Sequence, residues 1–279
     1  MVFIMLALPV VQVRAGEELP PQPAVQAPAD TSSFVKNDDK WVKAWNYIEP
    51  SVLWYLQYAW GEEKGESYNR ASVTRGYLTL KLKPVKWFTP RITLDTTQES
   101  GGDFKVRLKY LYGQLVLPVE TDFITEPNVE FGIVHVPWFD FEQSIYRYRA
   151  QGAIFIERNK VLNSADIGVT VGALLGSKLS KDYQEKISKY DPGKWGSLSF
   201  GIYNGGGYNA VENNQNKVFQ SRVSLRPLGW ILPNLQLSHL FIFGKGNTPK
   251  EICDENNVCK PGEPDWMLNL IMASFEHQY

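Results

Sequence analysis

The chain has 279 residues, of which 43% are hydrophobic and 21% are charged. Its 29 basic and 30 acidic residues give a net charge of -1, which argues against a nucleic-acid-binding protein, because such proteins usually carry a strongly basic surface. The apolar content is too high for a disordered chain. Aromatic residues make up 13% of the chain, which is typical of a protein with side chains at a membrane interface.

The first residues are predicted to form a secretory signal peptide. The apolar run from Val2 to Val11 is too short to cross about 30 Å of hydrocarbon as a helix, and Pro9 interrupts it. Cleavage is predicted after Ala15, so we assign residues 1–15 to the signal. No Lys or Arg precedes the apolar run, and a frayed apolar N-terminus is the alternative. Residues 16–40 are rich in Pro and Ala and are predicted to be an extended linker.

Residues 41–279 contain short segments in which apolar and polar side chains alternate, which is the pattern of β-strands. In one of them, Leu78 and Leu80 share one face while Thr79 and Lys81 share the other. The pattern predicts an all-β, antiparallel fold with about ten strands, which fall at 51–60, 75–83, 91–97, 105–112, 129–136, 166–172, 197–203, 219–226, 235–243 and 266–277.

The segment 105–112 has a strongly basic polar face. Its alternation places Tyr110 and Tyr112 on the apolar face. The opposite face carries a row of three basic residues, namely Lys105, Arg107 and Lys109.

The alternation alone fits two architectures. In a soluble sandwich the apolar face packs against a second sheet. In a transmembrane barrel it meets lipid, and the polar face lines a wet lumen. Strands near 10 residues exceed the mean of about 5–6 in soluble proteins and match a tilted spanning strand. A sheet in lipid must also close, because unpaired edges are costly there. We therefore expect a transmembrane β-barrel in a bacterial outer membrane, with an exported soluble β-sandwich that binds carbohydrate as the alternative.

The connections and the aromatic residues favour the barrel. Short turns at 84–88 and 227–233 alternate with longer polar loops, as in outer-membrane proteins, although the long and helix-like stretch 176–195 breaks the rule. The predicted long loops are 61–69, 98–104, 137–164, 204–215 and 245–264. Aromatic residues cluster at predicted strand ends and are expected to form girdles at both interfaces, as follows: Trp54, Tyr55, Trp60, Trp87, Phe88, Tyr110, Tyr112, Trp138, Trp195, Trp230 and Trp266.

The chain has two cysteines, Cys253 and Cys259, in a polar stretch rich in Asn, Pro and Gly. In an exported protein they are predicted to form a disulfide that closes a surface loop, with two free thiols as the alternative. No further sulfur or nitrogen ligands lie near them in the sequence, so no metal site is predicted.

Several stretches in the middle of the chain carry a family resemblance. They are Phe131-Gly132, Pro137-Trp138, Tyr146-Arg147-Tyr148-Arg149, Asp166-Ile167-Gly168-Val169, Tyr190-Asp191-Pro192-Gly193-Lys194-Trp195, Ser199 through Tyr208, Glu212-Asn213-Asn214, Lys217, Arg222-Val223 and Arg226-Pro227-Leu228. Together they resemble the phosphate-selective porin O and P family over about residues 70–225, and no single motif among them is diagnostic.

The resemblance implies a sixteen-stranded, often trimeric outer-membrane barrel that conducts small solutes, with anion preference in some members. Because about ten strands are predicted, the chain is expected to be an N-terminal part of such a barrel, with a closed ten-stranded barrel as the alternative. The implied partners are outer-membrane lipid and lipopolysaccharide, small hydrophilic solutes or anions, and two further copies in a homotrimer. No cofactor and no nucleic acid are expected.

In the porins that the chain resembles, the third long loop folds into the lumen and narrows it, which makes 137–164 the predicted constriction. Its candidate residues are Arg147, Arg149 and Arg158, the first two expected on one side of an extended backbone. Guanidinium and ammonium groups raise the local concentration of anions in a pore. The predicted pore-lining basic residues are Arg75, Lys81, Lys105, Arg107, Lys109, Arg222 and Arg226, opposed by Asp95, Glu130 and Asp166.

Enzymatic chemistry is not expected. The three histidines, at 135, 239 and 277, lack the short spacing of metal ligands, and the first two are expected to be structural. Gly205-Gly206-Gly207 is not followed by a helical pattern or a Lys-Ser/Thr pair, so we expect a loop and not a phosphate-cradling turn.

Overall fold

The computed structural model describes residues 3–4, 47–99, 101–149, 152–247, 250–253 and 259–277. All ten predicted strands are present in one antiparallel sheet, and each strand pairs with its neighbours in sequence. Their bounds are β2 (Ile48–Glu63), β3 (Glu66–Leu82), β4 (Phe88–Gln98), β5 (Phe104–Val116), β6 (Ile124–His135), β7 (Ala165–Leu175), β8 (Gly196–Tyr203), β9 (Val218–Leu225), β10 (Leu235–Lys245) and β13 (Asp265–Phe275). The all-β, antiparallel prediction is confirmed.

The remaining strands are short. A two-residue strand β1 (Phe3–Ile4) pairs with the outer edge of β2, and β11 (Lys250–Cys253) pairs with β12 (Cys259–Gly262) in a separate hairpin. Apart from β1, the predicted signal peptide and linker lie outside the described residues.

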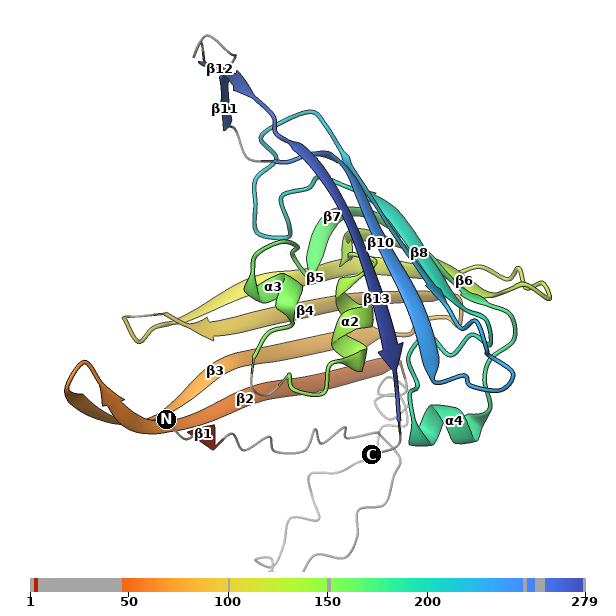
Figure 1. Ribbon diagram of the computed structural model, residues 1–279, viewed down its shortest axis with the longest axis horizontal. Helices are drawn as coiled ribbons and strands as arrows, with labels where there is room; N and C mark the ends of the chain where they lie inside the picture. Colours follow the sequence, from red (N-terminus) through yellow and green to blue (C-terminus); the bar gives the residue numbers. More distant parts are fainter. Residues whose placement is uncertain are drawn as a thin grey trace, which may run out of the picture.

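The sheet curls strongly but does not close. Figure 1 shows β2 to β5 along one side and β7 to β13 sweeping over the other, with a concave face between them. Within the described residues β13, at one end of the sheet, pairs with neither β2 nor β1 at the other end. The predicted closure of the barrel is therefore not seen in this sheet.

The strands continue through one predicted loop. Residues 61–69 were expected to be a long loop, but β2 and β3 extend through them to a two-residue turn at Lys64 and Gly65. Both turn residues have positive φ, 55° and 84°, which is the conformation of the tight turn that joins antiparallel strands. The prediction was wrong because backbone pairing continues here through polar residues.

The connection between β6 and β7, residues 136–164, folds back into the concave face, as the constriction hypothesis expects (Figure 1). We call it the inserted loop. It contains α2 (Phe139–Ile145) and α3 (Phe155–Arg158). A third helix, α4 (Lys181–Lys186), lies in the connection 176–195, where the sequence indicated helical character.

The inserted loop supplies six of the fourteen buried residues of the hydrophobic core cluster. Its fully buried side chains pack against inward-facing residues of β5, β6, β8, β9 and β10, and the cluster includes Trp138, Phe139, Ile154, Ile156, Tyr203, Val218, Leu240 and Ile242. Burial of this many large apolar side chains fixes the loop to the sheet, because each contributes about 1.5–3 kcal/mol. The interior on the β8–β13 side is thus filled with protein.

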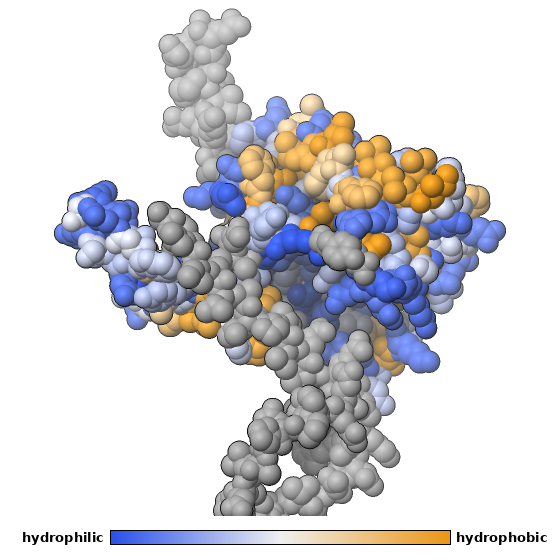
Figure 2. Space-filling model, turned by 60° about the horizontal axis from the view of Figure 1, so that its bottom comes forward, coloured by the Kyte–Doolittle hydropathy of each residue, from blue (hydrophilic) through white to orange (hydrophobic). Residues whose placement is uncertain are grey.

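The outer face of the sheet is apolar, whereas the inner face is mixed and carries buried polar side chains beside the apolar residues of the core. On paired positions of β7 and β8, Val169 and Ile202 are 43% and 56% exposed. Inward-facing Gln220 and Ser224 are 1% and 0% exposed. Figure 2 shows hydrophobic residues gathered on the outer surface and hydrophilic residues around the hollow. An extended apolar outer face of this kind is unusual for a soluble protein.

One predicted face is corrected by a β-bulge. Thr93 pairs with Tyr110, but the next residue of β4, Leu94, pairs with Leu108, so Lys109 is an extra residue in β5. Tyr110 and Tyr112 are consequently buried on the inner face, at 4% and 7% exposure, and not on the apolar outer face as predicted. A single inserted residue reverses the alternation beyond it.

Exposed aromatic side chains gather at one end of the sheet. Exposed Trp87, Trp195 and Trp230 lie in the connections that follow β3, β7 and β9, and Phe123 stacks near Trp195 with 5.6 Å between ring centroids. We call this the turn end. Trp138 does not belong to a girdle, because it is 1% exposed in the core, and the bulge removes Tyr110 and Tyr112 as well.

Candidate functional site

Two adjoining cavities of about 480 and 510 Å³ separate the inserted loop from the inner face of the sheet. They share five lining residues, which are Lys81, Arg91, Asp140, Ser144 and Tyr190. We call the two together the lumen cavity. Its walls come from β2 to β9 on one side and from α2 and the 176–195 connection on the other.

The register of the sheet builds the basic wall of this cavity. Lys81 on β3 pairs with Arg91 on β4, and Arg91 pairs with Tyr112 on β5. Paired residues share a face, so all three side chains point inward. The bulge then adds Lys109 to the same face as Tyr110.

Lys81, Arg91 and Lys109 have no carboxylate partner within 4.0 Å among the described residues. Arg91 instead donates to the hydroxyls of Thr93 and Tyr112. The ammonium group of Lys109 lies 4.7 Å from the centre of the Tyr77 ring. Three cations therefore line one cavity without direct neutralisation. Lys81 and Lys109 were predicted to line the pore, and Arg91 is an additional member.

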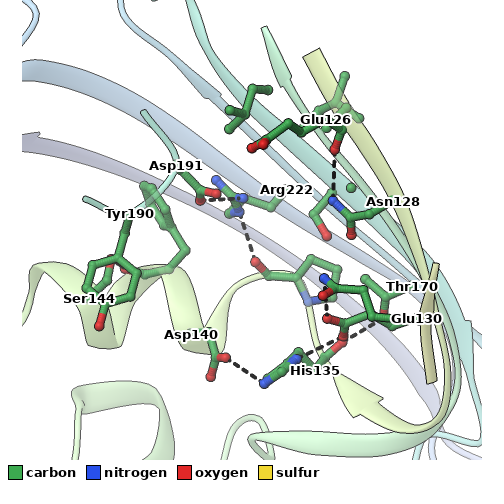
Figure 3. A pocket seen from close by; sticks show the side chains of 18 of the residues that line it. Glu126, Asn128, Glu130, His135, Asp140, Ser144, Thr170, Tyr190, Asp191 and Arg222 are labelled. Atoms are coloured by element: carbon green, nitrogen blue, oxygen red, sulfur yellow. Dashed lines mark hydrogen bonds and ion pairs between the residues drawn. The ribbon is translucent and has the colours of Figure 1, made fainter. Parts of the chain in front are cut away.

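His135 joins the inserted loop to the wall of the cavity (Figure 3). Its Nδ1 atom lies 2.8 Å from Glu130 Oε2, and its Nε2 atom lies 2.9 Å from Asp140 Oδ2. Arg91 Nη1 is 3.1 Å from the same Nε2 atom. Desolvation opposes ionisation of Asp140, but attraction to His135 and to Arg91 outweighs it and holds the pKa of that carboxyl at about 2.

The alternation of side chains along a β-strand does not predict this bridge. Glu130 and His135 are five residues apart, which would place them on opposite faces of a regular strand. His135 is the last residue of β6, where the chain leaves the sheet to enter the interior. The prediction that His135 is structural is consistent with its contacts, although its place beside the cavity was missed.

A second charged cluster lies beside α3. Asp95 is 1% exposed and pairs with Arg107 at 2.9 Å and with Arg75 at 4.0 Å. Arg75 also binds Glu157 on the inserted loop at 3.1 Å, and Arg149 lies 3.2 Å from the same carboxylate. The predicted pore residues Arg75 and Arg107 thus face inward but are matched by carboxylates.

Arg222 and Arg226 hold the 176–195 connection in place. Arg222 pairs with Asp191 at 2.9 Å and donates to Ser197, Ser224 and the carbonyl of Pro137. It touches the lumen cavity with its charge already compensated. Arg226 is 2% exposed and lines neither cavity. Its guanidinium donates to the backbone carbonyls of Asp191, Gly193 and Pro233.

The other predicted basic residues do not meet at one point. Lys105 is exposed and pairs with Glu99 at 3.4 Å. Arg147 and Arg149 diverge, because Arg147 donates to the carbonyl of His277 while Arg149 lies over the ring of Tyr55. Their backbone forms a turn and not an extended segment, so the expected common side is wrong. Arg158 is exposed and donates to the carbonyl of Ala153, within the inserted loop.

Three further sequence predictions concern the two cysteines, Asp166 and the absence of a metal site. Cys253 and Cys259 are directly opposite each other in the β11–β12 register, while their side chains lie outside the described residues, so the disulfide stays a prediction. Asp166 accepts from the backbone amides of Ile167 and Gly205 and fixes the glycine-rich loop. In the described part of the chain, no group of three His, Cys, Asp or Glu side chains could hold a metal ion.

No family model, curated protein or solved structure matches this chain. The resemblance to the phosphate-selective porins therefore stays a prediction. Over the described ranges, no helix is both long and apolar enough to cross a bilayer.

Proposed function

We propose that the chain forms the wall of an outer-membrane channel through which small hydrophilic solutes, preferentially anions, diffuse passively. The observation that carries this proposal is the extended apolar outer face of the sheet, combined with charged and polar side chains that line a cavity on its inner face. A row of exposed apolar side chains is an aggregation hazard in water, whereas in a bilayer the same surface is favourably buried. Charged side chains without ion-pair partners, such as those that line the cavity, are costly in a dry core and are expected in a wet lumen.

The architecture favours a membrane channel over the soluble alternative. A carbohydrate-binding sandwich needs two sheets packed face to face. The sheet here is single, and its concave face holds a loop with two short helices. An inserted loop that narrows the interior gives the channel a selective zone at the lumen cavity.

The charge of that zone supports anion preference. Three uncompensated cations, Lys81, Arg91 and Lys109, line the 510 Å³ part of the cavity. Its one acidic residue, Asp140, is bound to His135. A confined set of cations raises the local concentration of anions and lowers that of cations.

Closure of the barrel belongs to the same proposal. In lipid, the free edge of β13 and the part of the β2 edge that the two-residue β1 leaves unpaired would leave backbone groups without hydrogen bonds, at several kcal/mol for each group. We propose that further strands pair with both edges and complete the barrel. A homotrimer and contact with lipopolysaccharide rest on the family resemblance alone.

The location is tested by fractionation of cells that express the full-length chain. We expect the protein in the outer membrane, resistant to extraction by salt, and with a mobility in gels that changes on boiling. Recovery in the soluble periplasmic fraction would refute the proposal.

The selectivity is tested by the reversal potential of single channels under a KCl gradient. We expect the unmodified channel to prefer chloride, and the triple variant Lys81→Gln, Arg91→Gln, Lys109→Gln to lose most of that preference. The control is Lys105→Gln, whose side chain is exposed and paired with Glu99. A cation-selective unmodified channel would contradict the anion preference.

A further inference from the structure

The lumen cavity contains aromatic and apolar groups as well as cations. The 510 Å³ part is lined by Leu53, Tyr77, Tyr110 and Tyr190 in addition to its three basic residues. A volume of this size lies within the range of about 300–1,000 Å³ that small organic ligands occupy. Inorganic oxyanions have no apolar surface to place against these groups.

Cations and rings alternate along the basic wall. The guanidinium of Arg91 lies 4.7 Å from the centre of the Tyr110 ring, and the ammonium of Lys109 lies 5.6 Å from the same ring. Lys109 is also 4.7 Å from the Tyr77 ring. Arg91 and Lys109 therefore each have an aromatic ring beside them, which suits a ligand that offers a negative charge and a flat ring together.

The opposite side of the cavity supplies a further ring. Tyr190 is 54% exposed and lines both parts of the cavity. It is carried by the 176–195 connection, which Arg222 and Arg226 pin through Asp191. α2 adds the polar side chains Gln143 and Ser144 beside Asp140. Charge is thus concentrated on β3 to β5, and Tyr190 faces it from a separate element.

We infer that the lumen cavity binds monocarboxylates that carry an aromatic ring, in preference to inorganic oxyanions. The carboxylate contacts Lys81 and Arg91, and the ring packs between Tyr190 and the wall formed by Leu53 and Tyr77. This inference deepens the proposed function and rests on it for the route by which a ligand reaches the cavity.

The test is titration calorimetry of the full-length protein, folded in detergent, with benzoate, acetate and inorganic phosphate. We expect benzoate to bind about tenfold more tightly than either acetate or phosphate, since one buried ring face is enough for that ratio. The variant Tyr190→Ala should lower the affinity for benzoate to nearly that for acetate. The variant Lys81→Gln should lower the affinities for benzoate and for acetate by the same factor, about tenfold.

Two variants serve as matched controls. Tyr148→Ala removes an exposed ring outside the cavity, and Lys105→Gln removes an exposed cation outside it; neither should change any affinity. Partitioning of benzoate into detergent micelles gives the same heat with every variant. This background heat is measured with the double variant Lys81→Gln, Tyr190→Ala and subtracted. The inference is overturned if phosphate binds most tightly, if benzoate and acetate bind equally, or if Tyr190→Ala leaves benzoate unchanged.

This measurement needs no membrane. Failure of the channel proposal would be seen in fractionation and conductance, whereas failure of the ligand class would be seen in the calorimeter alone.

Discussion

The Nε2 atom of His135 lies 2.9 Å from the Oδ2 atom of Asp140, and this contact ties α2 of the inserted loop to the end of β6. On its other side the same ring meets Glu130 at 2.8 Å, so one imidazole links two carboxylates from different elements. The bridge stands beside the uncompensated cations of the lumen cavity and positions the polar face of α2 toward them.

Asp140→Asn is expected to weaken the attachment of the inserted loop. The loss should be about 1 kcal/mol, because the Asp140 side chain is 48% exposed and solvent screens the pair. Urea unfolding of protein folded in detergent measures it. The control Asp182→Asn removes an exposed carboxylate at the turn end, paired only with Lys186, and should have no measurable effect.

The same bridge predicts an acid-dependent loss of stability. The pKa of Asp140 lies below its ordinary value of 3.8, at about 2 in the folded chain. The contribution of ionised Asp140 to the free energy of unfolding is therefore complete above pH 4 and is lost as the pH falls toward 2. Unfolding of the unmodified protein and of Asp140→Asn should converge over this interval. A difference that stays constant from pH 7 to pH 2 would contradict the assignment.

Trp138→Ala should be strongly destabilising. Trp138 is 1% exposed in the core beneath the inserted loop, and its indole N–H donates to Glu142 at 2.7 Å. Truncation leaves a large cavity and an unpaired acceptor, for a cost of about 3–5 kcal/mol. Tyr148→Ala in the same loop is the control, because Tyr148 is 61% exposed. Equal urea midpoints for the two variants would show that the loop is not anchored by its core.

Gly132→Ala is predicted to disturb the pairing of β5 with β6. Gly132 has a φ of 123°, and an added Cβ would lie 2.3 Å from the carbonyl oxygen of Leu111. A shift of backbone is unavoidable, and we expect a loss of about 2–3 kcal/mol in unfolding free energy. Gly101→Ala, where no atom lies within 4 Å of the added Cβ, should leave the unfolding curve unchanged.

Val169→Arg tests whether the outer face of the sheet meets lipid or water. Val169 is 43% exposed near the middle of β7, and in water an exposed substitution changes stability by less than about 0.5 kcal/mol. In a bilayer the cost should be about 2–4 kcal/mol. Folding into lipid vesicles, followed by gel mobility without boiling, measures the difference. Val211→Arg, at a loop position that is 78% exposed, is the control and should fold normally.

The sequence predicted most of the sheet because strand geometry has a period of two. Segments such as 75–83 and 219–226 alternate cleanly, and the structure contains a strand over each of them. The same rule failed at 105–112, where the extra residue Lys109 turns Tyr110 inward. Nothing in the residue types around Lys109 marks a bulge, since its cause is the pairing with β4.

By itself, the sequence determined the fold class, the ten main strands and their order, and the apolar and polar faces of most of them, because these depend on neighbours a few residues apart. It did not predict the short strands β1, β11 and β12. Only the tertiary structure decided which basic side chains have no carboxylate partner among the described residues. Arg75, Arg107 and Arg222 find carboxylates on other strands and loops, whereas Lys81, Arg91 and Lys109 do not. Such pairing depends on contacts between residues that are distant along the chain, and no local pattern encodes it.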